Sequence, residues 1–424
     1  SAVVVGPGSV TTASSMGASY NYALLWVVIM AALASFFYQL PAIRVALAKE
    51  VTIMEAVRMR FGKVWALVLY YCIAFGSLIF QAGNFTGAAM AMEYFVPQIP
   101  LVGWAAIMIL VAFVLAWSSH YSVLETFTKG LVIMMVIAFV ATAIGSKPDM
   151  GDMITQGFSF QIPEGDFFLV LAMLATTMVP DIPVSLSALH KQRYFKKDSF
   201  EASLPQKTKM KLAHFDLVFG CAVTALITSA IVICSATNLF PLGVTVSSAA
   251  DMAGQLTPIL GQYAGILFSL GLWAAAFSSG LFRIELLPML YNQATDQEED
   301  MKAPRSRLWM ILSAGVPLIF ILLFGASPAE LVVMAQALNG LLLPVICAFL
   351  TDAGAYFAGV FLGRHRGITR VSPNKSLEGY IGGILCGGLF LVLYGLLLRN
   401  FAGLDASIPV MALYGLVGSA VTEV

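Results

Sequence analysis

The residues best suited to chemistry in this sequence surround Asp181, which lies between Pro180 and Pro183 in an apolar stretch. Each proline removes a backbone donor and clashes with the preceding helical turn, so together they predict a broken helix. A carboxylate at bilayer depth costs about 2.5–3.5 kcal/mol on insertion scales. Such a break is tolerated only where it lines a cavity or is buried in protein. This pattern indicates a candidate ion site, although Asp181 could instead be a structural acid paired with a lysine or a backbone amide.

A second interruption, Gly-Pro-Gly-Ser at residues 6–9, offers free carbonyls, helix ends and one hydroxyl. Taken alone, it could be a simple kink. The threonines before Asp181 can bond back to their own helix, and amides such as Gln336 and Asn339 often only hold membrane helices together. The candidate metal ligands are Asp181, the hydroxyls of Ser9, Thr176 and Thr177, the carbonyls of Gly6 and Val179, and Gln336 through water.

The elements that must position these groups are membrane helices. The 424 residues are 59% hydrophobic and 11% charged, which is about half the charged fraction of a soluble protein. Repeated apolar runs of 18 or more residues place the chain among all-α polytopic membrane proteins. A net charge of zero gives no sign of a nucleic-acid partner, and five isolated cysteines fit core positions. We expect spans near residues 1–19, 22–47, 64–92, 101–117, 122–145, 164–190, 212–238, 258–291, 308–324 and 328–350, then two or three more.

Lysine and arginine gather in alternate connections of this arrangement: those after spans two, six, eight and ten. The intervening connections hold almost none. By the positive-inside rule the basic loops are cytoplasmic, in a multi-pass protein of the plasma membrane.

The two interrupted helices correspond if the first ten spans form two halves of five. An odd number of spans per half requires the halves to be inverted. Gly/Pro interruptions at matching positions of two halves point to a transport site near the bilayer midplane. The first helix is expected to be incomplete at its start, because the sequence opens inside an apolar stretch without a charged leader.

Several motifs resemble Nramp divalent-metal transporters: residues 6–12 running on to 20–26, residues 185–189, 274–280, and 335–344. The resemblance covers about residues 1–350 and implies a LeuT-type fold of five plus five helices, with metal bound between the broken first and sixth helices. The family's Asp-Pro-Gly-Asn motif is Gly-Pro-Gly-Ser here, and its Met-Pro-His motif is Val179-Pro180-Asp181. An oxygen site with one carboxylate and no thioether suits Mg²⁺, with Mn²⁺ as the alternative. The pattern resembles the Nramp-related magnesium transporter branch.

The family's two sixth-helix histidines would fall at Asp181 and Leu186. Neither position holds histidine, so we expect import by alternating access without proton coupling. No resident cofactor and no catalytic residue is expected in this part of the chain; the partners are the transported metal ion and the lipid bilayer.

The tail, residues 351–424, resembles CDP-diacylglycerol synthase (phosphatidate cytidylyltransferase), which makes CDP-diacylglycerol from CTP and phosphatidate. The resemblance lies in residues 351–359 and 372–383 and implies, if the tail were active, a site of Asp352, Ser372, Lys375 and Glu378. An acid for Mg²⁺ and cationic or hydroxyl donors for phosphates fit nucleotidyl transfer. The rest of that family's signature is missing, so we expect packing helices without activity, joined at a boundary near 350/351. The alternative function for the chain is therefore this synthase activity, and the third hypothesis is a membrane scaffold without transport.

Overall fold

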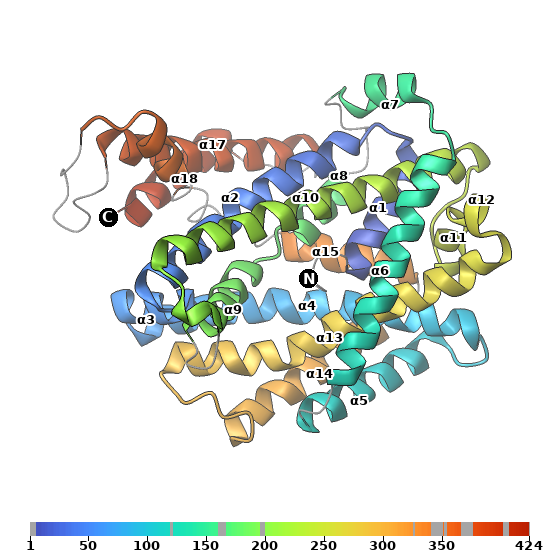
Figure 1. The fold of residues 1–424 in the computed structure, drawn as a ribbon, viewed down its shortest axis with the longest axis horizontal. Helices are drawn as coiled ribbons and strands as arrows, with labels where there is room; N and C mark the ends of the chain where they lie inside the picture. The colour runs from blue at the N-terminus through green and yellow to red at the C-terminus, as the bar shows by residue number, and fades with distance from the viewer. Residues whose placement is uncertain are drawn as a thin grey trace.

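The computed structural model describes residues 6–118, 122–159, 167–195, 200–324, 327–340, 351, 354–365, 376–401 and 407–423. These residues form an all-helical bundle (Figure 1). The long helices are α1 (Pro7–Tyr20), α2 (Leu25–Lys49), α4 (Lys63–Phe95), α5 (Leu101–Ser118), α6 (Ser122–Gly145), α8 (Phe167–Thr177), α9 (Ile182–Phe195), α10 (Gln206–Asn238), α13 (Ala264–Thr295), α14 (Pro304–Phe324), α15 (Pro328–Gly340), α17 (Leu377–Phe401) and α18 (Ile408–Glu423). Within the described part, nine segments are long and apolar enough to cross a membrane. Where the predicted spans fall on described residues, they agree with these helices to within about six residues; residues 1–5 of the first predicted span and 341–350 of the tenth lie outside the described ranges.

Short helices occupy the connections, which the sequence analysis treated as loops. They are α3 (Ile53–Phe61), α7 (Met150–Gly157), η1 (Phe200–Ser203), η2 (Phe240–Leu242), α11 (Ala249–Gly254), α12 (Thr257–Leu260) and η3 (Gly261–Tyr263). The helix α3 begins with a reciprocal cap, in which Thr52 Oγ1 accepts from Glu55 N and Glu55 Oε2 accepts from Thr52 N. That pairing satisfies two backbone donors that a helix start would otherwise expose.

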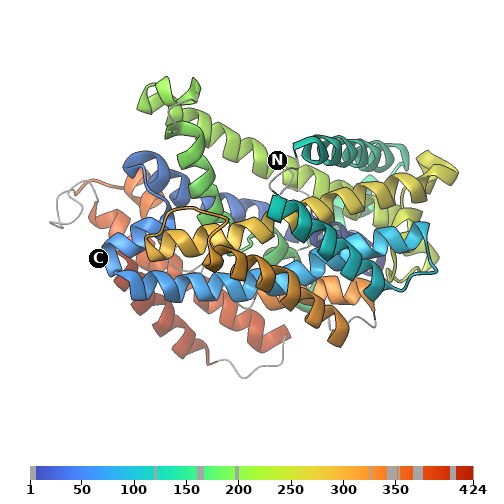
Figure 2. The same ribbon diagram turned by 90° about the horizontal axis from the view of Figure 1, so that it is seen from below.

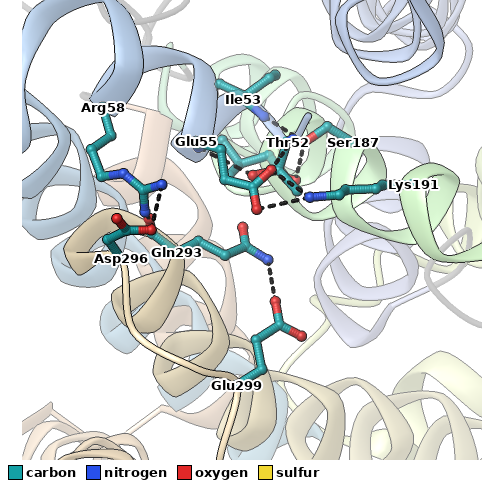
Figure 3. Close-up of polar contacts among 10 residues, drawn as sticks. Thr52, Ile53, Glu55, Arg58, Ser187, Lys191, Gln293, Asp296 and Glu299 are labelled. Atoms are coloured by element: carbon teal, nitrogen blue, oxygen red, sulfur yellow. Dashed lines mark hydrogen bonds and ion pairs between the residues drawn. The ribbon is translucent and has the colours of Figure 1, made fainter. Parts of the chain in front are cut away.

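The basic connections contact one another (Figure 3). Arg58 of α3 forms a 2.7 Å ion pair with Asp296, the residue after α13. Lys191 of α9 forms a second 2.7 Å ion pair with Glu55 of α3. The connections after spans two, six and eight therefore lie together, as the positive-inside rule predicts from their lysines and arginines.

The connections poor in basic residues meet at the other end. Asn21, between α1 and α2, donates to Gln156 of α7 at 3.2 Å. Asn238, which ends α10, donates to Ser146 Oγ and to the Gln255 carbonyl, both at 3.0 Å. Figure 1 shows α3 and α9 towards the left edge and α7, α11 and α12 towards the right. The alternation of loops between two ends is therefore a property of the fold.

At this second end, Asp251 of α11 holds the helix start. Its carboxylate accepts from both the hydroxyl and the backbone N–H of Ser247 and of Ser248, at 2.7–3.1 Å. Burial raises the pKa of the Asp251 carboxyl, but these four hydrogen bonds outweigh it and hold the pKa below its ordinary value.

The described part of the tail packs on the bundle. In α17, Leu391 and Tyr394 share an apolar cluster with Tyr38 of α2 and with Met178, which follows α8. The guanidinium carbon of Arg44, on α2, lies 3.2 Å from the centroid of the Tyr356 ring. Figure 2 shows α17 and α18, in red, along one side of the bundle. The predicted boundary near 350/351 falls beside residues outside the described ranges, so the domain division stays a prediction.

Candidate functional site

The break in the sixth span lies where the prolines predict it. The helix α8 ends at Thr177 and α9 begins at Ile182, with Pro183 in its first turn, where a missing N–H costs little. Ile182 N donates to the Val179 carbonyl at 3.0 Å, which closes a tight turn around the break. The chain then resumes as a helix, since Ser185 N donates to the Asp181 carbonyl at 2.9 Å.

The carboxylate of Asp181 is buried in an ion pair with an arginine. Arg283 Nη1, from α13, donates to Asp181 Oδ2, and the two side chains are only 7% and 3% exposed. The other oxygen, Oδ1, is buried and has no hydrogen-bond partner among the described residues. The sequence analysis allowed a structural ion pair for Asp181 but named lysine; the partner is an arginine from span eight.

Two residues of α4 hold the arginine in place. Its guanidinium carbon lies 4.1 Å from the centroid of the Phe80 ring, and Arg283 Nη1 lies 3.4 Å from Ser77 Oγ. On the same pair of helices, Gln81 Nε2 donates to the Gly280 carbonyl at 2.7 Å. Interhelical hydrogen bonds of this kind hold helices together in lipid, where burial supplies little driving force. The pair α4 and α13 is therefore a fixed support for Arg283.

The predicted hydroxyl and carbonyl ligands near the break already have partners in the protein. Thr177 Oγ1 donates to the Met173 carbonyl at 2.9 Å, and the Thr177 carbonyl accepts from Ser35 Oγ at 3.0 Å. This back-bonding is the structural alternative that the sequence left open. Thr176 is half-buried, and the Val179 carbonyl accepts the turn hydrogen bond described above. Their role as metal ligands stays a prediction.

The predicted ligands of the first span lie at the start of α1. Ser9 Oγ accepts from Gly6 N at 3.1 Å and donates to the Gly6 carbonyl at 2.9 Å, so the hydroxyl caps its own helix. The Gln336 side chain lies between α1 and α4: a Cβ added at Gly8 would be 2.5 Å from Gln336 Cδ, and one at Gly83 would be 3.0 Å from Gln336 Nε2. Gln336 is thus beside the interrupted helix, as predicted.

Among the described residues, no hydrogen bond joins Asp181 to Gly6, Ser9 or Gln336, and ligand oxygens that share an ion would make none. Arg283, the ion-pair partner of Asp181, contacts α4 at Ser77. Gln336 lies beside Gly83 of the same helix, about 9 Å further along the helix axis. Near this second position, Asn84 Nδ2 donates to Gln81 Oε1 at 3.1 Å.

Buried oxygens without partners accumulate on the helices that meet here. Among the described residues, the fully buried amide of Gln336 makes no hydrogen bond through either of its atoms, and the same is true of Asn339. Buried polar atoms without a hydrogen-bond partner are rare in proteins, and each needs an explanation, of which a bound water or ion is one. The others on α1 and α4 are Thr11 Oγ1, Thr12 Oγ1, Tyr70 Oη, Asn84 Oδ1 and Thr86 Oγ1.

Arg283, Asn84 and the threonines of α1 and α4 were missed by the sequence analysis. A signal for Arg283 existed: Arg283 and Glu285 are charged residues inside an otherwise apolar span, and such residues are functional by default. The hydroxyl and amide residues carry no comparable signal, because threonine and asparagine occur in many membrane helices without a role in binding.

The donor set around the break is made of oxygens. Met178, the nearest thioether in sequence, is 3% exposed and packs with Tyr38 and Leu391 in an apolar cluster. No group of three or more histidine, cysteine, aspartate or glutamate residues that could hold a metal occurs in the described residues. A cation bound here would depend on one carboxylate with amides, hydroxyls and water.

In the tail, only one of the four predicted synthase residues can be examined. Asp352, Ser372 and Lys375 lie outside the described residues. Glu378 accepts hydrogen bonds from Arg364 N at 3.0 Å and from His365 Nδ1 at 2.6 Å. Its carboxylate thus joins the start of α17 to the preceding loop.

The known proteins that this chain resembles in sequence include divalent metal cation transporters. A divalent metal cation transporter MntH of Caldanaerobacter subterraneus is 24% identical and aligns over 94% of this chain and 90% of its own length. The MntH of Deinococcus radiodurans is also 24% identical, over 78% of this chain and 74% of its own. The 94% coverage cannot be reached without part of the tail, and these matches lend no support to the synthase interpretation.

Solved structures share the fold. The crystal structure of the Eremococcus coleocola manganese transporter superposes with a TM-score of 0.67 at 16% identity, covering 100% of this chain and 92% of that one. The nucleobase-cation-symport-1 family transporter Mhp1 superposes with a TM-score of 0.56 at 18% identity, covering 100% and 89%. The chain therefore has the LeuT-type fold that the sequence predicts.

The family model described as "Natural resistance-associated macrophage protein-like" matches residues 1–352, which is most of the chain. This match agrees with the two interrupted helices, the alternating loops and the fold. The chain belongs to the Nramp family.

Proposed function

We propose that this chain carries a divalent metal cation across a membrane by alternating access, with Asp181 as the carboxylate ligand and Mg²⁺ as the ion. The observation that carries this proposal is the buried Asp181 at the helix break, with one oxygen unpartnered among the described residues. A carboxylate held at such a break is the kind of group that binds an ion in discontinuous helices. The relatives support the cation class, since their names describe divalent metal cation and manganese transporters.

The choice of Mg²⁺ rests on the donors. Oxygen ligands with room for water suit Mg²⁺, which loses its hydration shell reluctantly, whereas a thioether would favour softer metals. Met178 packs away in an apolar cluster, and the described residues offer no histidine or cysteine group. Mn²⁺ also accepts oxygen ligands and is named for the Eremococcus protein, so it is the competing ion.

In the proposed cycle, the bundle containing α1, α8 and α9 rocks against the support formed by α4 and α13. The ion enters from one side, binds at Asp181 and, through water, at the amide of Gln336, and leaves toward the side of the basic loops. That side is the cytoplasm of a cell whose plasma membrane holds the protein. The break carries no histidine, so transport proceeds without proton coupling.

The test is flux into liposomes containing the purified protein, with Mg²⁺, Mn²⁺ and Ca²⁺ in competition. Mg²⁺ should enter and be inhibited by Mn²⁺ more than by Ca²⁺. Because Asp181→Asn alone leaves Arg283 without its counter-charge, the decisive variant is the neutral pair Asp181→Asn/Arg283→Gln, which should fold and carry no metal. The matched control is Asp216→Asn, which removes an exposed acid paired with Arg193.

Three results would each contradict a part of the proposal. Full flux in the neutral double variant would reject Asp181 as a ligand. Entry of Mn²⁺ with no Mg²⁺ flux would keep the transport function and reject the assigned ion. A proton entering with every metal ion, read with an internal pH dye, would reject uncoupled transport.

A further inference from the structure

The ion pair between Arg283 and Asp181 connects the two parts that the proposed cycle moves relative to each other. Arg283 belongs to α13 and is supported by Phe80 and Ser77 of α4. Asp181 belongs to the break between α8 and α9. The contact therefore crosses from the support to the mobile bundle.

Only one oxygen of the Asp181 carboxylate is bonded to Arg283. Arg283 donates to Asp181 Oδ2, whereas Oδ1 is buried and has no hydrogen-bond partner in the described part of the chain. An arginine with a 7% exposed side chain in a membrane span needs a compensating charge, and so does a carboxylate that is 3% exposed. A divalent ion near Oδ1 would meet a carboxylate that is already neutralised, with a like charge beside it.

We propose that Arg283 is a built-in counter-charge that occupies Asp181 when no metal is bound and releases it when a metal ion arrives. Arg283 is a positioning residue rather than a ligand. The empty transporter can then return to its starting conformation without an uncompensated carboxylate and without a proton. This inference rests on the proposed function, because it assigns a role to Arg283 at the same carboxylate.

The surroundings of Asp181 leave few other groups to change protonation. Tyr38 of α2 faces the break, since its hydroxyl donates to the Pro180 carbonyl at 3.2 Å, and Tyr394 of α17 shares the apolar cluster of Met178. Tyrosine hydroxyls are neutral below about pH 9. On α9 the nearest histidine is His190, whose Nδ1 lies 2.9 Å from the Leu186 carbonyl, on a later turn. The α4 groups are Ser77 and Phe80, and the nearby α15 groups are the amides of Gln336 and Asn339, none of which titrates. The remaining carboxylates on α13 and α15 are Glu285 and, in the first turn of α15, Glu330.

The role of Arg283 separates two measurements on liposomes. Net uptake requires the empty transporter to return, whereas exchange of external for internal metal does not. With Mn²⁺ as the probe ion at pH 7.5, Arg283→Gln should lower net uptake by about a hundredfold, the scale of an uncompensated buried charge, and leave exchange within about twofold.

Three further variants complete the design. Arg283→Lys keeps the charge and should keep net uptake. Arg307→Gln is the matched control, because Arg307 also lies over an aromatic ring, that of Trp117 at 4.2 Å, but on a different helix pair. Phe80→Leu keeps both charges and loosens the support of Arg283, so it should slow net uptake more than exchange even if Arg283→Gln does not fold.

The inference is wrong if Arg283→Gln or Phe80→Leu slows exchange and net uptake equally, or if net uptake by Arg283→Gln equals that of the unmodified protein at pH 7.5. Failure of the proposed function has a different signature. In that case the unmodified protein carries no Mn²⁺ or Mg²⁺, or the neutral double variant carries as much as the unmodified protein.

Discussion

Replacing Asp181 by asparagine leaves the Arg283 guanidinium buried beside a neutral amide. Replacing Arg283 by glutamine leaves the Asp181 carboxylate buried in the same way. The side chains are 3% and 7% exposed, so neither stranded charge can turn to water without a rearrangement of the helices. The double replacement removes both charges and keeps two side chains of similar shape that can bond to each other.

The expected free-energy changes differ in size between these variants. Removing one partner of a buried ion pair costs about 3–5 kcal/mol, whereas replacing both by neutral groups is often close to neutral. With about 2.1 cal/mol/K of unfolding entropy per residue, the 424-residue chain has about 0.9 kcal/mol/K in total, so each single variant should lower Tm by about 3–6 °C. The double variant should lie within about 1 °C of the unmodified protein.

The assay is thermal unfolding in detergent, followed by the fraction that remains monodisperse on size-exclusion chromatography. Asp216→Asn serves as the control, because its ion pair with Arg193 is about half exposed and should change Tm little. If both single variants unfold at the same temperature as the unmodified protein, then the pair is hydrated or absent, and the geometry described for Asp181 is wrong.

Three further predictions follow from other contacts. Gly8→Ala would place a Cβ 2.5 Å from Gln336 Cδ and should destabilise the protein by about 1–3 kcal/mol, whereas Gly220→Ala meets open space and should stabilise it by up to about 1 kcal/mol; a fall in Tm for both would refute the steric argument. Glu55→Gln removes a partly exposed ion pair between α3 and α9 that is worth at most about 1 kcal/mol. The rate of amide hydrogen exchange in α9 should therefore rise by up to about fivefold, while that in α7 stays constant. An α9 exchange rate equal to that of the unmodified protein would mean that the pair does not stabilise this end. The lowered pKa of Asp251 stabilises the fold above the ordinary aspartate pKa of about 4, and this contribution is lost as pH falls through the folded-state pKa. Asp251→Asn should therefore lower Tm at pH 7 by an amount that shrinks below pH 4. A Tm difference from the unmodified protein that does not change with pH would contradict this linkage.

The sequence predicted those features that local chemistry determines. The span boundaries follow from apolar length, and the break at Asp181 follows from the two prolines beside it. The alternation of basic loops correctly grouped the connections after spans two, six and eight, because the positive-inside rule depends on loop charge and not on contacts between helices. One local feature was overlooked: Thr52 and Glu55 have the spacing of a capping box, which predicts a helix start at α3.

The contacts that define the site could not be read in this way. Asp181 and Arg283 are 102 residues apart in sequence, and their meeting depends on how α13 packs on α4 and the break. The position of Ser9 relative to Asp181 likewise depends on the orientation of the helices rather than on either motif. The predicted ligand set stays a prediction, and it lacked Arg283, the charge that is paired with Asp181 in the structure.

The packing of Gln336 between Gly8 and Gly83 has a consequence for the evolution of this chain. A β-carbon at Gly8 would require the glutamine side chain to move, and one at Gly83 would require it to shift by a few tenths of an ångström, so the three positions, on three helices, are sterically coupled. Relatives that carry a shorter residue at the position of Gln336 should be free to carry alanine or serine at either glycine. Relatives that keep the glutamine should keep both glycines, and an alignment of the family would show the three positions changing together.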